Sequence, residues 1–314
     1  HRPMTTYHIE PEHRTLHGKF SRELPPVLTI EPGDTVIFRT LDAGWGLEPA
    51  TSIEGERRKF EPHDPEMGKG HALCGPVEIR GAEPGMTLAI DIVDIRPGSY
   101  GATYAGGWSN DINDRLGISN QKGIMLAWAL DPDAKTATDQ LGHMVDLRPF
   151  MGVMGLPPDE PGLHPTAPPR FCGGNIDCKE LVAGTTLYLP ITVPGALFSV
   201  GDGHGRQGDG ESSTTAIECP MERVELTFHL HSDVRINTPR ARTSEGWLTL
   251  AFHRDLNEAA ALALEAMLDL MMEQYGVERL EALALASVVA DLRVTQMVNG
   301  VKGVHAVLPH GAIR

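Results

Sequence analysis

The sequence predicts a mainly β protein with an α+β portion, namely a sandwich- or barrel-like β core followed by C-terminal helices. Glycine (34 residues) and proline (24 residues) are frequent, which indicates many turns and many short strands. Strand–turn–strand segments with alternating apolar residues recur before residue 250. The remaining chain has the apolar spacing of helices, and strands with segregated helices are typical of α+β architectures.

Three segments carry the strand–turn–strand pattern, and we expect each to form a β-hairpin. Residues 26–40 contain two alternating stretches around a Pro-Gly-Asp turn. Residues 77–96 repeat this arrangement around Glu-Pro-Gly, and residues 181–200 repeat it after Ala-Gly-Thr. Residues 152–177 are rich in glycine and proline, so we expect a long irregular loop of the kind that often carries function. Hairpins of this type pack as sandwiches or barrels.

The C-terminal part predicts two helices and a final strand. Asp255 and Glu258 resemble a capping box, and the helix that they begin should end at Gly276. A second stretch, residues 278–292, is largely apolar and should be a buried helix. Residues 294–308 return to a strand and turn pattern.

The length of 314 residues suits one large or two small domains. We expect residues 1–250 to form the β-rich core that carries the functional site. Residues 251–314 should add a helical segment and a terminal strand that pack on this core within one integrated domain.

Charge and cysteine content narrow the class of protein. Lys and Arg number 27 against 42 Asp and Glu, a net charge of −15 that argues against nucleic acid or an anionic membrane as the main partner. A small neutral or cationic ligand is compatible with this charge. The four cysteines include no Cys-x-x-Cys pair, and no signal peptide or membrane-length apolar run is present. We therefore expect free thiols and a cytoplasmic protein.

Residues 201–211 are the most informative segment, with five glycines, three carboxylates and one imidazole. Glycines allow the backbone to approach a ligand closely, and Asp, Glu and His are common metal ligands. No Gly-Lys-Ser/Thr follows, so this is not a phosphate-binding loop, and its acids do not have EF-hand spacing. A solvated turn has similar composition, but the clustering favours a metal or catalytic site.

Two further clusters contain candidate ligands. Paired glycines precede Asn175 and Asp177, and Asp177 is a credible carboxylate ligand, although a β-bulge or turn explains the same residues. His71 lies just before a predicted strand, where an ordinary hydrogen-bonded histidine is also common. Trp45 and Trp108 lie in glycine-rich segments and are candidates for the wall of a small pocket or for rim positions.

These clusters stand in long blocks that resemble the acetamidase/formamidase family of amide hydrolases. The blocks cover most of the chain in the same order, namely GHALCGPVEIRGAEPGMTLAIDIVDI, GGNIDCKELVAGTTLYLPITVPGALFSVGDGHGRQGDGESSTTAIE and DLRVTQMVNGVKGVHAVLP. The resemblance implies a β-rich fold with an accessory α/β portion. It also implies hydrolysis of short aliphatic amides to a carboxylate and ammonia, with a divalent metal at the site, zinc first and calcium second.

The resemblance also indicates which residues belong to the site. The positions that fall on the family's blocks are His71, Asn175, Asp177, Asp202, His204, Asp209 and Glu211. Three positions depart from the family pattern: Cys74 replaces a threonine, Cys178 replaces an aliphatic residue, and Gly205-Arg206 replaces a pair of small residues. These departures leave the identity of the substrate open, and Arg206 either faces solvent or meets a polar or anionic substrate group.

Amide hydrolysis needs an activated water and a means of holding the developing oxyanion. Our hypothesis is that Asp177, Asp202 and His204 hold the metal, with His71 as a further candidate. Glu211 or Asp209 would accept the proton of the water and return one to the leaving nitrogen. The full candidate set is catalytic Glu211, Asp209 and His71, metal-binding Asp177, Asp202 and His204, and substrate-binding Asn175, Gly203, Trp108 and Arg206.

Two other readings remain at this point. One is an amidase with a cysteine nucleophile, for which Cys172 and Cys178 are the candidates. The other is a non-catalytic metal- or ligand-binding β-domain, in which Asp209 and Glu211 could bind a structural calcium ion. We expect the partners to be a small amide substrate and a second copy of the chain, in a homodimer or homotetramer.

Overall fold

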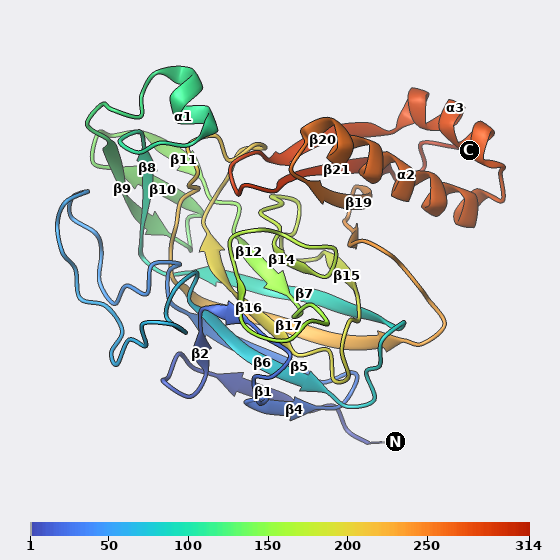
Figure 1. The fold of residues 1–314 in the computed structure, drawn as a ribbon, viewed down its shortest axis with the longest axis horizontal. Helices are drawn as coiled ribbons and strands as arrows, with labels where there is room; N and C mark the ends of the chain where they lie inside the picture. The colour runs from blue at the N-terminus through green and yellow to red at the C-terminus, as the bar shows by residue number, and fades with distance from the viewer. Residues whose placement is uncertain (1) are drawn as a thin grey trace.

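The computed structural model describes residues 2–314 and confirms a mainly β fold with C-terminal helices (Figure 1). The nine-stranded sheet has the order β1 (Thr6–Ile9), β5 (Thr35–Thr40), β17 (Met221–His231), β7 (Thr87–Pro97), β15 (Thr186–Pro190), β18 (Arg240–Arg242), β19 (Gly246–His253), β21 (Lys302–Pro309), β20 (Asp291–Gln296). The six-stranded sheet has the order β14 (Gly173–Asn175), β12 (Phe150–Gly155), β16 (Phe198–His204), β6 (Leu73–Ile79), β2 (Leu16–His17), with β4 (Leu28–Ile30) also beside β6. The four-stranded sheet has the order β11 (Met144–Asp146), β10 (Thr136–Asp139), β9 (Ile124–Asp131), β8 (Tyr100–Ala105). A two-stranded sheet pairs β13 (His164–Pro165) with β3 (Lys19–Phe20).

The two large sheets face each other across the main hydrophobic core. The ring of Phe198 on β16 lies 6.4 Å from that of Phe38 on β5 and 5.0 Å from that of Phe228 on β17. These three side chains are fully buried and come from opposite sheets. Edge-to-face aromatic contacts, with the buried aliphatic residues around them, therefore hold the two sheets together as a sandwich.

The three predicted hairpins are wrong in their pairing, although their strands and turns form. β4 pairs with β6 in the six-stranded sheet, whereas β5 pairs with β1 and β17 in the nine-stranded sheet. In the same way, β6 and β7 lie in different sheets, and so do β15 and β16. Each turn thus carries the chain from one layer of the sandwich to the other. Alternating apolar residues indicate strands with one buried face, and this pattern is the same whether two strands pair or face each other.

The long irregular loop predicted for residues 152–177 is partly wrong. Its beginning belongs to β12, a strand whose residues are all buried, and its end forms β14. A strand buried on both faces lacks the alternation by which strands are recognised in a sequence. The intervening segment is largely irregular, although its short strand β13 pairs with β3.

The C-terminal helices begin largely as predicted and form a lobe at one end of the molecule (Figure 1). Helix α2 (Leu256–Tyr275) begins after Asp255, whose side chain accepts a hydrogen bond from the Asn257 N–H, and it ends at Gly276 with φ of 65°. The helix packs on β19 and β21, where the Thr249 hydroxyl donates to the Ala263 carbonyl.

The prediction of a buried helix over residues 278–292 is wrong in its burial and its end. Helix α3 (Arg279–Val289) buries the small side chains of Ala282 and Ala286. Leu280 and Val288 are instead 82% and 81% exposed. A sequence that is apolar on all sides does not show which face packs, and here the alanine face lies against the lobe. The last predicted residues belong to β20, which pairs with β21.

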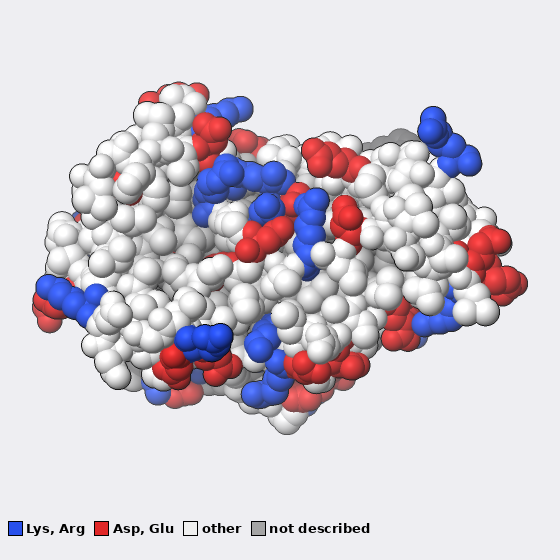
Figure 2. Space-filling model, turned by 90° about the horizontal axis from the view of Figure 1, so that it is seen from above, with Lys and Arg blue, Asp and Glu red and all other residues white. Residues whose placement is uncertain are grey.

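Short helix α1 (Asp111–Leu116) lies beside the four-stranded sheet (Figure 1). Figure 2 shows a face of the molecule on which acidic and basic side chains are interspersed, without the continuous basic stripe that nucleic acid requires. Within residues 2–314, no helix combines the length and the apolar character needed to cross a bilayer.

Candidate active site

Three neighbouring strands of the six-stranded sheet position the candidate site. β12 pairs with β14 on one side and with β16 on the other. β14 ends at Asn175, which places Asp177 just beyond the strand, and Asp202 and His204 belong to the last three residues of β16. Because side chains two residues apart in a strand point to the same face, Asp202 and His204 project together.

Gly152 on β12 leaves room between the two outer strands. A Cβ atom at this position would lie 2.5 Å from Oδ1 of Asp177 and 2.5 Å from Oδ2 of Asp202. No side chain fits there without displacing a carboxylate, so the missing Cβ of Gly152 creates a cradle. The Oδ1 atom of Asp177 is buried without a hydrogen-bond partner, while its Oδ2 accepts from the Asn299 amide at 2.7 Å.

His204 lies at the centre of the cluster of acids. Its Nε2 atom lies 3.1 Å from Oδ1 of Asp202, 3.0 Å from Oε2 of Glu218 and 3.8 Å from Oε2 of Glu211. Its Nδ1 atom lies 3.0 Å from Oε1 of Gln207. The Gln207 oxygen can only accept, so Nδ1 carries a proton and Nε2 faces the carboxylates.

Burial and mutual repulsion shift the acidity of these groups. Burial raises the pKa of Asp177 to about 6, with the nearby Asp202 carboxylate adding to the effect. Burial likewise raises the pKa of Glu218 to about 8, although 17% of its side chain is exposed. Burial and the Asp177 carboxylate raise the pKa of Glu211 well above its usual value.

The two remaining members of the cluster hold opposite charges. Burial alone would lower the pKa of His204, but the carboxylates of Asp202 and Glu218 outweigh it and raise the pKa strongly. Burial would raise the pKa of Asp202, but the His204 and His71 rings outweigh it and lower the pKa.

The backbone is strained at the same residues. Asp177, Asp202, Glu211 and Thr214 have φ angles of 52°, 59°, 46° and 80°, a region that favours glycine. Each such residue costs of order 1–3 kcal/mol, and strain of this kind is concentrated at active sites. The fold therefore stabilises an unfavourable backbone to hold these side chains in place.

The four carboxylates of the cluster line a cavity of about 440 Å³, whereas His204 is fully buried. His71 lines the cavity, with its Nδ1 atom 2.7 Å from the Thr166 hydroxyl and its Nε2 atom 3.8 Å from Oδ2 of Asp202. Asn175 donates from its amide to the Ala167 carbonyl, and its Oδ1 atom is buried without a partner. The structure thus brings together six of the candidate residues, namely His71, Asn175, Asp177, Asp202, His204 and Glu211.

The other four candidates lie outside this cavity. Asp209 pairs with Lys179 at 3.7 Å, and Arg206 is exposed and donates to the Asp146 carbonyl. Trp108 lines a separate hollow beside the four-stranded sheet. Gly203 packs closely against Met221 and Cys219, where a Cβ atom would lie 2.6 Å from the Met221 side chain.

Sequence reasoning missed Glu218, Gln207, Asn299 and Thr166. Glu218 reaches the cluster through an isolated β-bridge between its backbone and that of His204. Glu218 and Gln207 lie within the long block that resembles amide hydrolases, and Asn299 lies within its C-terminal block. Membership of these blocks was the available signal, but neither composition nor spacing distinguished these residues from ordinary turn residues.

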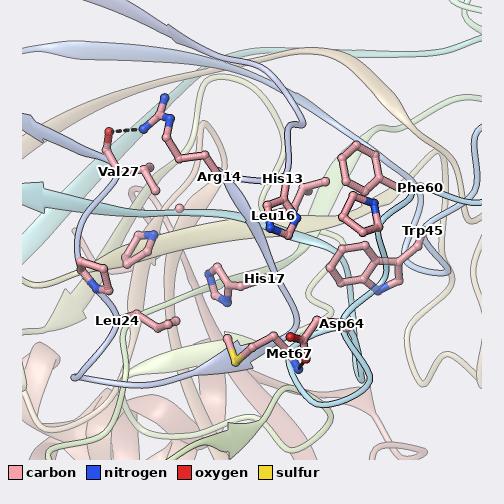
Figure 3. A pocket seen from close by; sticks show the side chains of 15 residues that line it. His13, Arg14, Leu16, His17, Leu24, Val27, Trp45, Phe60, Asp64 and Met67 are labelled. Atoms are coloured by element: carbon pink, nitrogen blue, oxygen red, sulfur yellow. Dashed lines mark hydrogen bonds between the residues drawn. The ribbon is translucent and has the colours of Figure 1, made fainter.

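A second hollow of about 260 Å³ contains none of the candidate catalytic, metal-binding or substrate-binding residues (Figure 3). Trp45, Phe60 and Met67 contribute to its walls, and Asp64 is its single carboxylate. The buried His17 ring also lines it, with Nε2 2.8 Å from the Ser199 hydroxyl. Burial lowers the pKa of His17 to about 4, so its ring is neutral at pH 7.

The four cysteines are buried and unpaired with one another. Burial raises the pKa of the Cys172 thiol to about 11, and it also raises the pKa of Cys178 strongly. A thiol of this kind is a poor nucleophile at neutral pH, because the thiolate is the reactive form.

The chain is similar in sequence to known proteins. Over residues 5–165 and 161–246, the chain matches the sequence pattern of the Acetamidase/Formamidase family. It is 26% identical over 255 residues to the acetamidase of Mycolicibacterium smegmatis, covering 62% of this chain and 61% of that protein. It is 26% identical over 249 residues to the formamidase of Methylophilus methylotrophus, covering 62% and 59% of the two chains.

The fold has a counterpart among solved structures. The crystal structure of an acetamidase from Bacillus halodurans superposes with a TM-score of 0.84 and 26% identity, covering 96% of this chain and 97% of that chain. In sequence, the matched region spans about 60% of the length of the curated relatives. The family pattern covers most of the chain, and we conclude that this protein belongs to the acetamidase/formamidase family.

Proposed function

We propose that the protein hydrolyses the C–N bond of short aliphatic amides to a carboxylate and ammonia. The observation that carries this proposal is the cluster of one buried imidazole and four carboxylates, whose carboxylates line an open cavity. Amide hydrolysis requires activation of both the water and the carbonyl, and few arrangements other than a metal site need so many buried acids.

The residues present fit a divalent cation. Two groups, Asp177 with His204 and Glu211, and Asp202 with His204 and Glu218, have ligand atoms within 4.8 Å of one another. His204 belongs to both groups, so we propose one ion per chain. The unpartnered Oδ1 of Asp177 and the cradle above Gly152 support this site. Zinc suits the combination of imidazole and carboxylates, whereas calcium prefers oxygen ligands alone.

In the proposed mechanism, His204, Asp202, Asp177 and Glu218 hold the metal. A bound zinc ion would supply Lewis acidity, which polarises the amide carbonyl and acidifies a water molecule. Gln207 fixes the ring of His204 so that Nε2 is available as a ligand.

Glu211 is the proposed general base. Its side chain is 5% exposed and lines the cavity, and its raised pKa makes the carboxylate a stronger base than a solvated glutamate. Glu211 takes a proton from the attacking water and passes it to the leaving nitrogen, so that ammonia departs. Asp209, the alternative base in our hypothesis, pairs with Lys179 outside the cavity.

Two polar residues are proposed to orient the substrate. The unpartnered Oδ1 of Asn175 is an acceptor suited to the amide NH₂ group. The ring of His71, held by Thr166 and facing Asp202, is suited to donate towards the developing oxyanion.

Ammonia release from formamide, acetamide and propionamide tests this function. We expect turnover of these amides, and the dependence on acyl length would also report the usable depth of the cavity. Metal binding without release of ammonia from any amide would instead support the non-catalytic metal-binding domain.

We also propose that the chain acts as a cytoplasmic homo-oligomer. The buried unpaired thiols suit a reducing compartment, and the exposed Leu280 and Val288 on α3 offer an apolar surface for a second copy.

A further inference from the structure

The cavity above the cluster is larger than acetamide requires. Its volume of about 440 Å³ lies within the range of about 300–1,000 Å³ typical of sites for much larger ligands. Among the described residues that line it, none is Leu, Ile, Val, Met, Phe, Tyr or Trp. A longer alkyl chain would therefore find no large apolar side chain to pack against, whereas a polar acyl group would find hydroxyls, amides and charges.

Two lysines, Lys19 and Lys69, line this cavity. Lys19 is half-buried on β3, and the next residue, Phe20, is packed in a small core cluster with Val153. Strand alternation directs Lys19 away from that core and towards the cavity. Lys69 is exposed, so it belongs to the outer part of the cavity.

The segments that carry the two lysines are held side by side. The Gly18 N–H donates to the Met67 carbonyl at 2.6 Å, and β3 pairs with β13, whose Pro165 also lines the cavity. Within residues 2–314, the pair of Lys179 with Asp209 is the single ion pair that uses a lysine. The ammonium groups of Lys19 and Lys69 thus remain available, although the chain as a whole carries a net charge of −15.

We propose that the substrate is an amide whose acyl chain ends in a carboxylate, which pairs with Lys19 and Lys69 while the amide lies on the acidic floor. This inference rests on the proposed amidase function. The ammonium group of lysine binds a carboxylate as a point charge, and cations at a cavity entrance raise the local concentration of an anionic substrate. Arg206 is excluded from this role, because it lies outside the cavity and donates to the Asp146 carbonyl.

Matched pairs of amides test the proposal. Succinamate and butyramide have the same chain length, and so do glutaramate and valeramide, but the first of each pair ends in a carboxylate. We expect kcat/KM for the anionic member to exceed that of its neutral counterpart by about tenfold or more at low ionic strength. The preference should shrink as salt is added, because screening weakens exposed charges.

The variants Lys69→Met and Lys19→Met/Lys69→Met locate the effect. We expect the double variant to lose the preference through a higher KM for succinamate, while kcat/KM for acetamide stays within about twofold. Lys122→Met is the matched control, because Lys122 lines a different hollow, and it should retain the preference. Lys69→Met, at an exposed position, provides a variant whose folding is not in question.

Each outcome separates this inference from the proposed function. Turnover of neutral amides with equal or poorer turnover of anionic ones overturns the inference and leaves the amidase function intact. A preference that survives the double variant also overturns it, since the two lysines would then not recognise the carboxylate. Release of ammonia from no amide of either kind overturns both.

Discussion

Replacing Glu211 with Gln removes a proton acceptor while keeping the shape of the side chain. Glu211 is 5% exposed and lies 3.8 Å from Nε2 of His204, so an amide of equal size fills the same space. A positioned general base contributes about 10²–10⁴-fold to the rate, which corresponds to about 2.7–5.4 kcal/mol. We expect Glu211→Gln to lower kcat for acetamide by this factor without loss of bound zinc.

Stability should change in the opposite direction from activity. Burial and the Asp177 carboxylate raise the pKa of Glu211, which means that the folded state disfavours its charged form. A neutral glutamine removes that repulsion, so the melting temperature should be unchanged or higher. Loss of activity with a retained melting temperature therefore identifies a chemical role.

Asp209→Asn is the matched control in the same loop. Asp209 contacts Lys179 at 3.7 Å outside the cavity, and removing such a pair costs about 0–1 kcal/mol of stability. Activity should stay within about threefold of the wild type. If Glu211→Gln keeps more than about a tenth of the activity, or if Asp209→Asn loses as much, the assignment of the base is refuted.

Three further predictions test the cradle, the core and the cysteines. Gly152→Ala would place a methyl group 2.5 Å from two carboxylate oxygens, so the affinity for zinc, measured by calorimetry, should fall about 10–100-fold. Gly208→Ala is the control: a Cβ atom there would meet no atom within 4 Å, so its zinc affinity should match that of the wild type. Burial lowers the pKa of His305 from 6.5 to about 3. As the pH falls below 6.5, this histidine therefore becomes protonated in the unfolded chain but stays neutral in the folded protein. This residue should lower the free energy of unfolding of the wild type by about 2 kcal/mol between pH 7.5 and pH 5, as measured by urea unfolding at each pH. His305→Leu should lack this part of the pH dependence. The same pH dependence in both proteins would contradict the reasoning. Iodoacetamide should leave native activity intact, because all four thiols are buried. Inactivation at the rate of labelling would instead support the cysteine nucleophile, for which Cys172 and Cys178 are the candidates.

The strands were readable from the sequence, but their partners were not. Alternating apolar residues identified β4, β5, β6 and β7, of which β5 buries every second residue and β6 is buried at every position except Glu78. The turns between them have ordinary hairpin composition, yet they connect facing sheets. Pairing depends on contacts between distant segments, such as β7 with β17 and β15, which local pattern does not encode.

The site was predictable where its ligands share one loop or strand. Asp202 and His204 were predicted as ligands because they stand together in the glycine-rich segment, and the structure places both at the end of β16. Glu211 and Asp209 are also two residues apart, but they lie in a loop where Gly210 adopts a φ of 100°, and spacing does not fix direction there. Glu218 joins the cluster only through its bridge to His204, a contact that exists once the sandwich has formed.

The most direct test of the account is a zinc titration of metal-free protein, with ammonia release from acetamide recorded at each step. We expect activity to rise in proportion to bound zinc and to saturate at one ion per chain, since both ligand groups share His204. Full activity in protein shown to be free of metal, or zinc bound at one ion per chain without release of ammonia, would contradict the account.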